Sequence, residues 1–333
     1  MMNEMRMIKR MFPVACCLGC MLLAWGSCSE GAEGETRPGL PAVGEVPLQV
    51  SVSMEGEPVD TRAAVPLEPD GGVIHVIRSN ANGYAPAERT YQYTANESGS
   101  GSWAMQGDEL PIYIDSRRAQ LRAYYDPNGL IDNTGTKATL KAQLYDDRQL
   151  MYYCTSAANT PINCFKPNAK FNMKLPYARL KLTLKRDDEN YLAGDCNITA
   201  IALSYKSGST STFYTGRNLD VTTGSLTTTV TAAAYTQEVV IGPLAPGETN
   251  ADTYDVLLPP QSVGSGLTIT LTIDGIKRAI TLPTSQMSSF VAGSQYTVSL
   301  LILDTFYVTM IGYVWVEGFT SGTDLSVNGE TID

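Results

Sequence analysis

The residues that could do chemistry in this chain are one histidine and several runs of carboxylates. His75 is the only histidine among 333 residues, which excludes histidine-based zinc sites, Ser-His-Asp triads and Cys-His dyads in their usual forms. It lies within a predicted strand, VIHVI, where we expect a structural role. The runs Asp146-Asp147 and Asp187-Asp188-Glu189 are typical of solvated turns. Paired carboxylates for glycoside hydrolysis stay open as an alternative, because Asp and Glu number 34.

The sequence contains no motif for phosphate binding or for an activated nucleophile in a context where it could act. This applies to the patterns GxxxxGK[ST], GxGxxG and GxSxG, and to the spacing of a calcium-binding loop. We therefore expect no catalytic residue, no metal and no cofactor, in a protein that is not an enzyme. The net charge of −10 also disfavours nucleic acid as a partner, because an acidic chain repels phosphate backbones.

Three cysteines lie in the body of the chain, Cys154, Cys164 and Cys196. Cys154 and Cys164 flank a turn-rich stretch, TSAANTPIN, and can pair in an oxidising compartment, which would leave Cys196 as a thiol. The equal alternative is three buried thiols. Three cysteines are too few for a Cys₄ metal site.

The first 27 residues are predicted to be a signal peptide. Basic residues precede the apolar run MFPVACCLGCMLLAW, which at fifteen residues is shorter than the roughly 20 needed to span a membrane. The run ends at Gly26-Ser27-Cys28, which resembles a bacterial lipobox, so we predict lipidation at Cys28. Acyl chains on Cys28 would anchor the protein to a membrane. The alternative is ordinary signal cleavage, with Cys28 incidental.

Residues 28–45 are predicted to form an acidic tether. They are rich in Glu, Gly and Pro and poor in apolar side chains, so they cannot build a core. Acidic residues directly after the lipidated cysteine also resemble the surface-export signal of lipoproteins in the Bacteroidales. We expect a surface-exposed lipoprotein of the outer membrane.

Alternation of apolar and polar residues predicts strands along the rest of the chain. Leu48, Val50, Val52 and Met54 alternate with polar residues, as a half-buried strand requires. The clearest hairpin joins residues 267–273 to residues 276–282 through Asp274-Gly275, which accepts the positive φ angles of a tight turn. Further candidate strands are residues 73–77, 110–114, 121–125, 180–184, 198–205, 254–258, 296–303 and 307–316. With no convincing helical stripe, an all-β fold of sandwich type is expected.

We expect a domain boundary near residues 175–179, because a Pro-rich, irregular stretch at residues 154–167 precedes it and a strong strand follows it. The predicted organisation is an N-terminal domain at 46–176, a C-terminal domain at 177–318 and a tail at 319–333. The tail is polar and rich in glycine, although Leu325 and Val327 alternate as a strand would.

The order of several segments resembles the fimbrillin family, the pilin-type lipoproteins of the Bacteroidales. The opening VPLQVSVSMEGEPVDTRAAVP is similar to the first strand of that family and the loop that follows it. The later segments that carry the resemblance are WAMQGD with LPIYI, LRAYYDP, FNMKLPYARLKLTL, VAGSQYTVSLLIL and YVTMIGYVWVEG. Two features depart from the family pattern: Asp126 precedes Pro127, and a histidine common near FNMKLPYARLKLTL is absent. The resemblance spans residues 28–318.

The resemblance implies two tandem transthyretin-like β-sandwich domains and a structural subunit, shaft or tip, of a fimbrium. In the family an arginine-specific protease can cut the loop after the first strand. Here the cut would fall between Arg62 and Ala63, and the strand with Leu48, Val50, Val52 and Met54 would leave. A segment of a neighbouring subunit would then fill the groove, with the tail around Leu325 and Val327 as candidate donor. The implied partners are neighbouring subunits, the protease, the outer membrane and ligands on host or bacterial surfaces.

The alternative function is a monomeric glycan-binding or adhesive surface lipoprotein. Trp103, Tyr124, Tyr125 and Trp315 can build a glycan platform, or each can be an ordinary core or edge aromatic. Arg62 is then a plain loop residue, since a monomeric binder needs no cleavage there.

Overall fold

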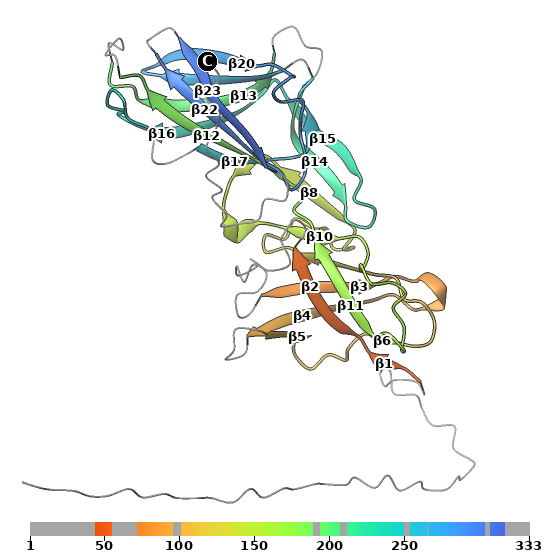
Figure 1. The fold of residues 1–333 in the computed structure, drawn as a ribbon. Helices are drawn as coiled ribbons and strands as arrows, with labels where there is room; N and C mark the ends of the chain where they lie inside the picture. The colour runs from red at the N-terminus through yellow and green to blue at the C-terminus, as the bar shows by residue number, and fades with distance from the viewer. Residues whose placement is uncertain are drawn as a thin grey trace, which may run out of the picture. The chain divides into compact units, whose positions relative to one another are not determined.

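The computed structural model describes residues 44–54, 72–95, 101–188, 194–206, 212–249, 254–264, 266–303 and 307–316 (Figure 1). Within these residues the regular structure consists of β-strands and two short 3₁₀ helices, Ala81–Gly83 and Asp147–Gln149. The predicted all-β fold is confirmed. None of the described helices is long and apolar enough to cross a membrane.

The first part of the chain forms a five-stranded antiparallel sheet and two small ladders. The sheet has the order β10-β7-β3-β4-β5, and the ladders are β11-β2 and β1-β6. The strands are β1 (Val46–Pro47), β2 (Gln49–Met54), β3 (Val73–Arg78), β4 (Ala87–Ala95), β5 (Gly101–Met105), β6 (Tyr113–Ile114), β7 (Leu121–Tyr125), β10 (Tyr152–Cys154) and β11 (Asn168–Met173). The predicted strand at residues 110–114 is therefore shorter than expected. The Leu110 carbonyl, before this strand, accepts a hydrogen bond from Arg89 Nε at 2.7 Å.

The second part of the chain forms a β-sandwich. Its two main sheets have the orders β23-β22-β12-β17-β9 and β16-β13-β19-β20, and the smaller sheets are β15-β14-β8 and β18-β21. The strands are β8 (Lys137–Lys141), β9 (Gln143–Leu144), β12 (Ala178–Arg186), β13 (Ile198–Tyr205), β14 (Phe213–Asp220), β15 (Leu226–Ala232), β16 (Ala234–Ile241), β17 (Tyr254–Leu258), β18 (Gln261–Ser262), β19 (Leu267–Ile273), β20 (Ile276–Leu282), β21 (Ser289–Phe290), β22 (Gln295–Ile302) and β23 (Val308–Val316).

The predicted hairpin is present. Strand β19 pairs with β20 from Leu267 opposite Leu282 to Ile273 opposite Ile276. Asp274 and Gly275 take φ angles of 46° and 79°, the left-handed values that a two-residue hairpin turn needs. The alternation of β19 places every second side chain in the core, as the period-two pattern requires.

Buried apolar side chains gather in two clusters. The first draws mainly on β2 to β11 and the second on the facing sheets of β12 and β13. Three residues from later in the sequence, Leu219, Val221 and Leu257, join the first cluster. Strands β8 and β9 lie between β7 and β10 in the sequence, yet they pair with the later strands β14 and β17 and so belong to the second group of sheets. All described residues belong to a single compact unit, and the boundary at residues 176 and 177 stays a prediction.

Candidate functional site

The most distinctive feature of the fold is the way its first strand is held. Strand β2 pairs with β11 in a parallel ladder that runs from Gln49 opposite Asn168 to Met54 opposite Met173. Among the described strands β11 is its only ladder partner. A strand with one partner keeps a row of main-chain groups outside any sheet, which is the property of an edge strand.

The inner face of β2 packs into the first hydrophobic cluster. Leu48, which directly precedes the strand, and Met54 are 4% and 5% exposed, and Val50 and Val52 are partly buried against the same cluster. Burial of a side chain of this size stabilises a fold by about 1.5–3 kcal/mol. Strand β2 is therefore held by the burial of its inner side chains and by the main-chain hydrogen bonds along one of its edges.

The outer face of β2 carries the polar side chains of the alternating pattern. Ser53 Oγ donates to Asn172 Oδ1 at 2.6 Å, and Ser51 Oγ lies 3.4 Å from the Ala169 carbonyl. At the start of the strand the Leu48 amide donates to the Ile112 carbonyl at 2.8 Å. These bonds fix the register of β2 on β11, because a slip of one residue would bring the serines into the core.

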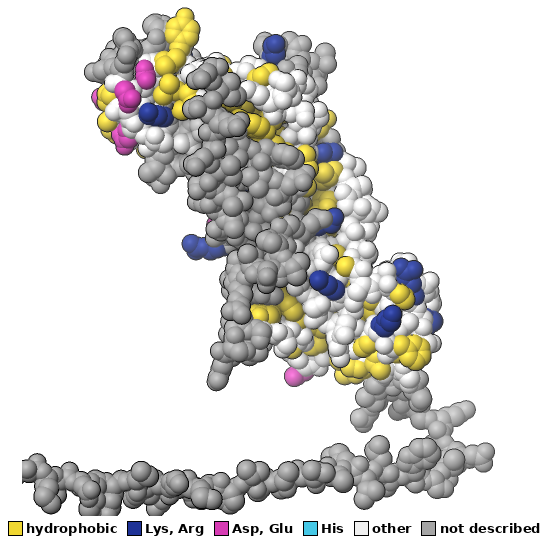
Figure 2. Space-filling model, in the orientation of Figure 1, with side chains coloured by type: hydrophobic (Ala, Val, Ile, Leu, Met, Phe, Trp, Pro, Cys, Tyr) yellow, Lys and Arg dark blue, Asp and Glu magenta, His cyan; other side chains and the backbone are white. Residues whose placement is uncertain are grey.

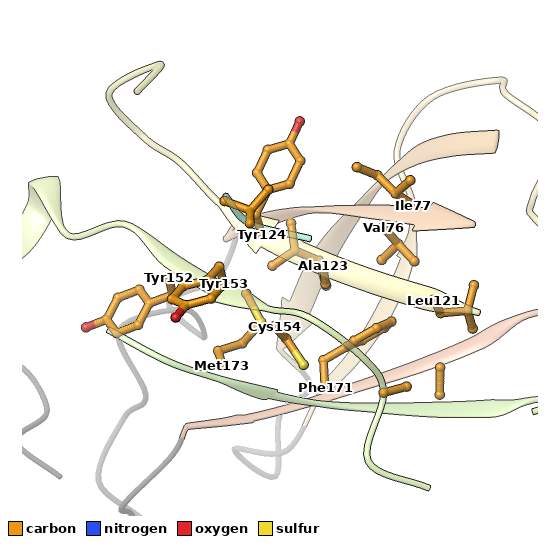
Figure 3. Close-up of a cluster of buried hydrophobic side chains, with 14 of the residues drawn as sticks. Val76, Ile77, Leu121, Ala123, Tyr124, Tyr152, Tyr153, Cys154, Phe171 and Met173 are labelled. Atoms are coloured by element: carbon orange, nitrogen blue, oxygen red, sulfur yellow. The ribbon is translucent and has the colours of Figure 1, made fainter. Parts of the chain in front are cut away.

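Strand β11 is the strand to which β2 is hydrogen-bonded, and its own inner face is deeply buried. Its inner side chains Ala169, Phe171 and Met173 are all 0% exposed, while the residues between them are exposed. Figure 3 shows Phe171 and Met173 beside Cys154 of β10 and below Leu121 and Ala123 of β7. The segment FNMKL thus contributes Phe171, Met173 and Leu175 to the first hydrophobic cluster, against which β2 also packs.

A cavity of about 920 Å³ lies between β2 and the edge strand β5. Its apolar lining includes Val50 and Val52 from β2, Tyr91 and Tyr93 from β4, and Trp103 from β5. Burial raises the pKa of Tyr91 to about 12. The first strand is therefore bounded by β11 on one side and by a cavity with a partly apolar lining on the other.

A polar cluster anchors β6, the strand that pairs with β1. Tyr84 OH donates to Asp115 Oδ1 at 2.7 Å, and Arg117 Nε donates to Asp115 Oδ2 at 2.8 Å. Arg78 donates to the Tyr113 carbonyl and lies over the Tyr84 ring at 4.7 Å. The hydrogen bond from Arg117 holds the pKa of Asp115 well below its usual range, and burial raises the pKa of Tyr84 to about 12. Sequence patterns did not single out this cluster, because Tyr84 and Asp115, which join its two segments, are 31 positions apart in the sequence.

The residues proposed for processing and assembly lie outside the described residues. These are Cys28, Arg62, Ala63, Leu325 and Val327. Strand β2 ends at Met54, and the described chain resumes at Gly72, so Arg62 belongs to the segment that follows the first strand. All five assignments stay predictions.

The cysteines that the structure describes form no disulfide. Cys154 is buried and its Sγ donates to the Ser156 carbonyl at 3.0 Å, while Cys164 is partly exposed and Cys196 is buried. The pairing of Cys154 with Cys164 is thus not formed in this structure, and it stays a prediction for the oxidised protein.

Side chains suited to a metal do not gather within the described part of the chain, where no group of three His, Cys, Asp or Glu residues could hold an ion. His75 stacks on Tyr124 with ring centroids 4.7 Å apart, and its Nδ1 lies 3.3 Å from Glu88 Oε1. Trp103 packs against Tyr93 at 5.4 Å. Both are packing contacts between neighbouring strands, and the glycan platform of Trp103, Tyr124, Tyr125 and Trp315 stays a prediction.

A family model described as fimbrillin-like matches residues 62–311. Comparison with curated proteins gives no match. Among solved structures, a proposed cell adhesion protein from Bacteroides uniformis aligns with a TM-score of 0.56 and 19% identity, covering 84% of this chain and 100% of that one.

Two further structures are similar. A proposed cell adhesion protein from Bacteroides ovatus has a TM-score of 0.53 and 16% identity, covering 80% of this chain and 96% of that one. A fimbrial protein from Bacteroides vulgatus has a TM-score of 0.50 and 12% identity, with 82% and 99% covered. At such identities the likeness establishes a shared fold.

Proposed function

Since this chain belongs to the fimbrillin-like family, we propose that it is a structural subunit, shaft or tip, of a cell-surface fimbrium. The family and the fold it shares with a fimbrial protein identify a cell-surface fimbrial or adhesin-like protein. The finer proposal is assembly by exchange of the first strand for a strand of a neighbouring subunit.

The observation that carries this proposal is the single-partner arrangement of β2. Loss of the strand would expose Phe171 and Met173, both fully buried in the intact fold, and would join their surface to the apolar cavity at β5. It would also free one edge of β11 for main-chain hydrogen bonds. An open groove with an unpaired edge binds an extended segment, with register set by alternate side chains.

The trigger is cleavage between Arg62 and Ala63 by an arginine-specific protease. The cut separates β2 and everything before it from the rest of the chain, including the proposed lipid anchor at Cys28. One cleavage would thus release the subunit from the outer membrane and open the groove. The tail at 319–333, with Leu325 and Val327, is the proposed donor, since an extended chain covers roughly 3.3 Å per residue.

The test is limited digestion of the purified protein with an arginine-specific protease. We expect an N-terminus at Ala63 and a ladder of oligomers on an unboiled gel. Arg62→Ala should abolish the conversion, and deletion of residues 319–333 should leave cleavage intact but weaken the ladder. The control is Arg148→Ala, which removes an exposed arginine elsewhere in the chain.

The outcomes separate the two candidate functions. If the cleaved wild type stays monomeric at high concentration, the proposal of a shaft subunit is wrong. A tip subunit or a monomeric glycan-binding lipoprotein then explains the protein better. If no cleavage occurs at Arg62, the proposed trigger is wrong.

A further inference from the structure

A second cavity, of about 300 Å³, lies apart from β2 and has a polar lining. Its hydroxyl groups come from Ser79, Thr155, Ser156, Thr160 and Thr222, and two arginines, Arg118 and Arg122, complete its polar surface. None of the described residues that line it is aromatic or acidic. We call this feature the arginine cavity.

The walls of the arginine cavity are held by main-chain hydrogen bonds. On the loop after β10, the Ala157 amide donates to the Leu121 carbonyl at 3.1 Å, and the Ala119 amide donates to the Ile162 carbonyl at 2.8 Å. The Thr222 amide donates to Asp220 Oδ1 at 2.8 Å, which closes the turn that carries Thr222. A wall fixed in this way is preorganised, so a ligand would lose little affinity to ordering the protein.

The two arginines are short of partners. Neither forms an ion pair within the described residues, and the Arg122 side chain makes only a long contact, with Nη2 3.5 Å from the Gly135 carbonyl oxygen. Arg122 Nε is buried with no hydrogen-bond partner in the described part of the chain. A buried donor without a partner costs free energy until something accepts its hydrogen bond.

The charge of the arginine cavity is opposite to that of the whole chain, whose net charge is −10. In the view of Figure 2, Lys and Arg side chains also gather over β1, β6 and β11, strands that do not themselves line the cavity. Guanidinium groups bind oxyanions such as carboxylates, because their planar fork matches two oxygens of the anion.

We propose that the arginine cavity binds an acidic monosaccharide, a uronic or a sialic acid, at the end of a glycan. The carboxylate pairs with Arg118 and Arg122, and the ring hydroxyls exchange hydrogen bonds with the serine and threonine hydroxyls. The volume is at the lower end of the range for small-molecule sites, which suits one sugar ring. A neutral sugar would lack the usual aromatic face on which to pack. The proposal does not depend on cleavage at Arg62 or on assembly.

The test is titration calorimetry of the intact protein with matched probes. D-glucuronate and N-acetylneuraminate carry both the carboxylate and the hydroxyls, D-glucose carries only hydroxyls, and acetate carries only the carboxylate. We expect binding of at least one acidic sugar, with affinity about tenfold or more above that for glucose and acetate. The affinity should fall as salt is raised, because the pairing is electrostatic.

Two variants and one control locate the site. Arg118→Gln and Arg122→Gln should each weaken binding of the acidic sugar about tenfold, whereas Arg148→Gln, at an exposed site outside the cavity, should bind as the wild type does. Arg118 is exposed, so its variant keeps the fold and tests the site even if Arg122→Gln lowers stability. Circular dichroism melting checks both proteins.

Four results would overturn the proposal. These are no binding of either acidic sugar, equal binding of glucose and glucuronate, unchanged affinity in Arg118→Gln, and tighter binding of a dipeptide with a free carboxyl terminus. The last result would identify a peptide carboxylate as the ligand. Immobilised glycans ending in the acidic sugar distinguish capture of a glycan end from capture of the free sugar alone, and failure to capture them would refute the glycan part.

Discussion

Val52 of β2 lies opposite Phe171 of β11 in a parallel ladder, and both side chains contact the same buried cluster. Phe171 is fully buried, whereas Val52 is only partly buried because the cavity at β5 begins on its other side. The pair thus joins the part of the core that stays with the subunit to the strand that is proposed to leave it.

Phe171 is expected to be one of the most sensitive positions in the first cluster. Phe171→Ala should lower the free energy of unfolding by about 3–5 kcal/mol, because it removes a fully buried ring and leaves a cavity. The matched control is Phe165→Ala, whose ring is 80% exposed, and which should change stability by less than about 0.5 kcal/mol. Urea denaturation of the two variants measures the difference. Equal losses would contradict the burial of Phe171 in the first cluster.

Asp115 should make stability depend on pH in the acid range. Its pKa is held below the usual value by Arg117 and Tyr84, so its stabilising effect is complete above the ordinary carboxyl pKa, near 3.9, and is lost as the pH falls through the lowered pKa. Asp115→Asn should therefore reduce the melting temperature at neutral pH more than at about pH 3. Asp108→Asn, at an exposed site, is the control. A loss for Asp115→Asn that is the same at both pH values would argue against the ion pair.

The cysteine thiols should react with iodoacetamide in a fixed order. Burial raises the pKa of Cys196 to about 11, which leaves little thiolate, and Cys154 is also buried. Cys164 is partly exposed and should be alkylated first in the native, reduced protein at about pH 8. Peptide mapping by mass spectrometry gives the order. If, in protein purified without reductant, the partly exposed Cys164 resists alkylation until a reductant is added, the disulfide between Cys154 and Cys164 forms in solution.

Cys28 is expected to carry the lipid. Expressed in a bacterium that processes lipoproteins, the wild type should incorporate a palmitate analogue and partition into detergent, because two or more acyl chains give stable anchoring. Cys28→Ala should do neither, while Cys164→Ala should behave as the wild type does. Equal labelling of Cys28→Ala and wild type would rule out Cys28 as the attachment site.

Much of the secondary structure follows from the sequence alone. Alternation of apolar and polar side chains predicts β7, β13, β17 and β19 within a residue of their observed ends, and Asp274-Gly275 predicts the turn between β19 and β20. These features depend on neighbours in the chain, which is why local patterns reveal them. The same patterns also predict that Leu48, Val50, Val52 and Met54 share one face.

Which strands meet was decided only by the tertiary structure. Ser53 bonds to Asn172 across 119 positions of sequence, and the alternation of β2 would be the same beside any partner, parallel or antiparallel. The arginine cavity likewise brings together Ser79, Arg122 and Thr222 from three separate segments. A period of two records which face of a strand is buried but not what covers it. Partner and register are therefore set by long-range packing of the apolar faces.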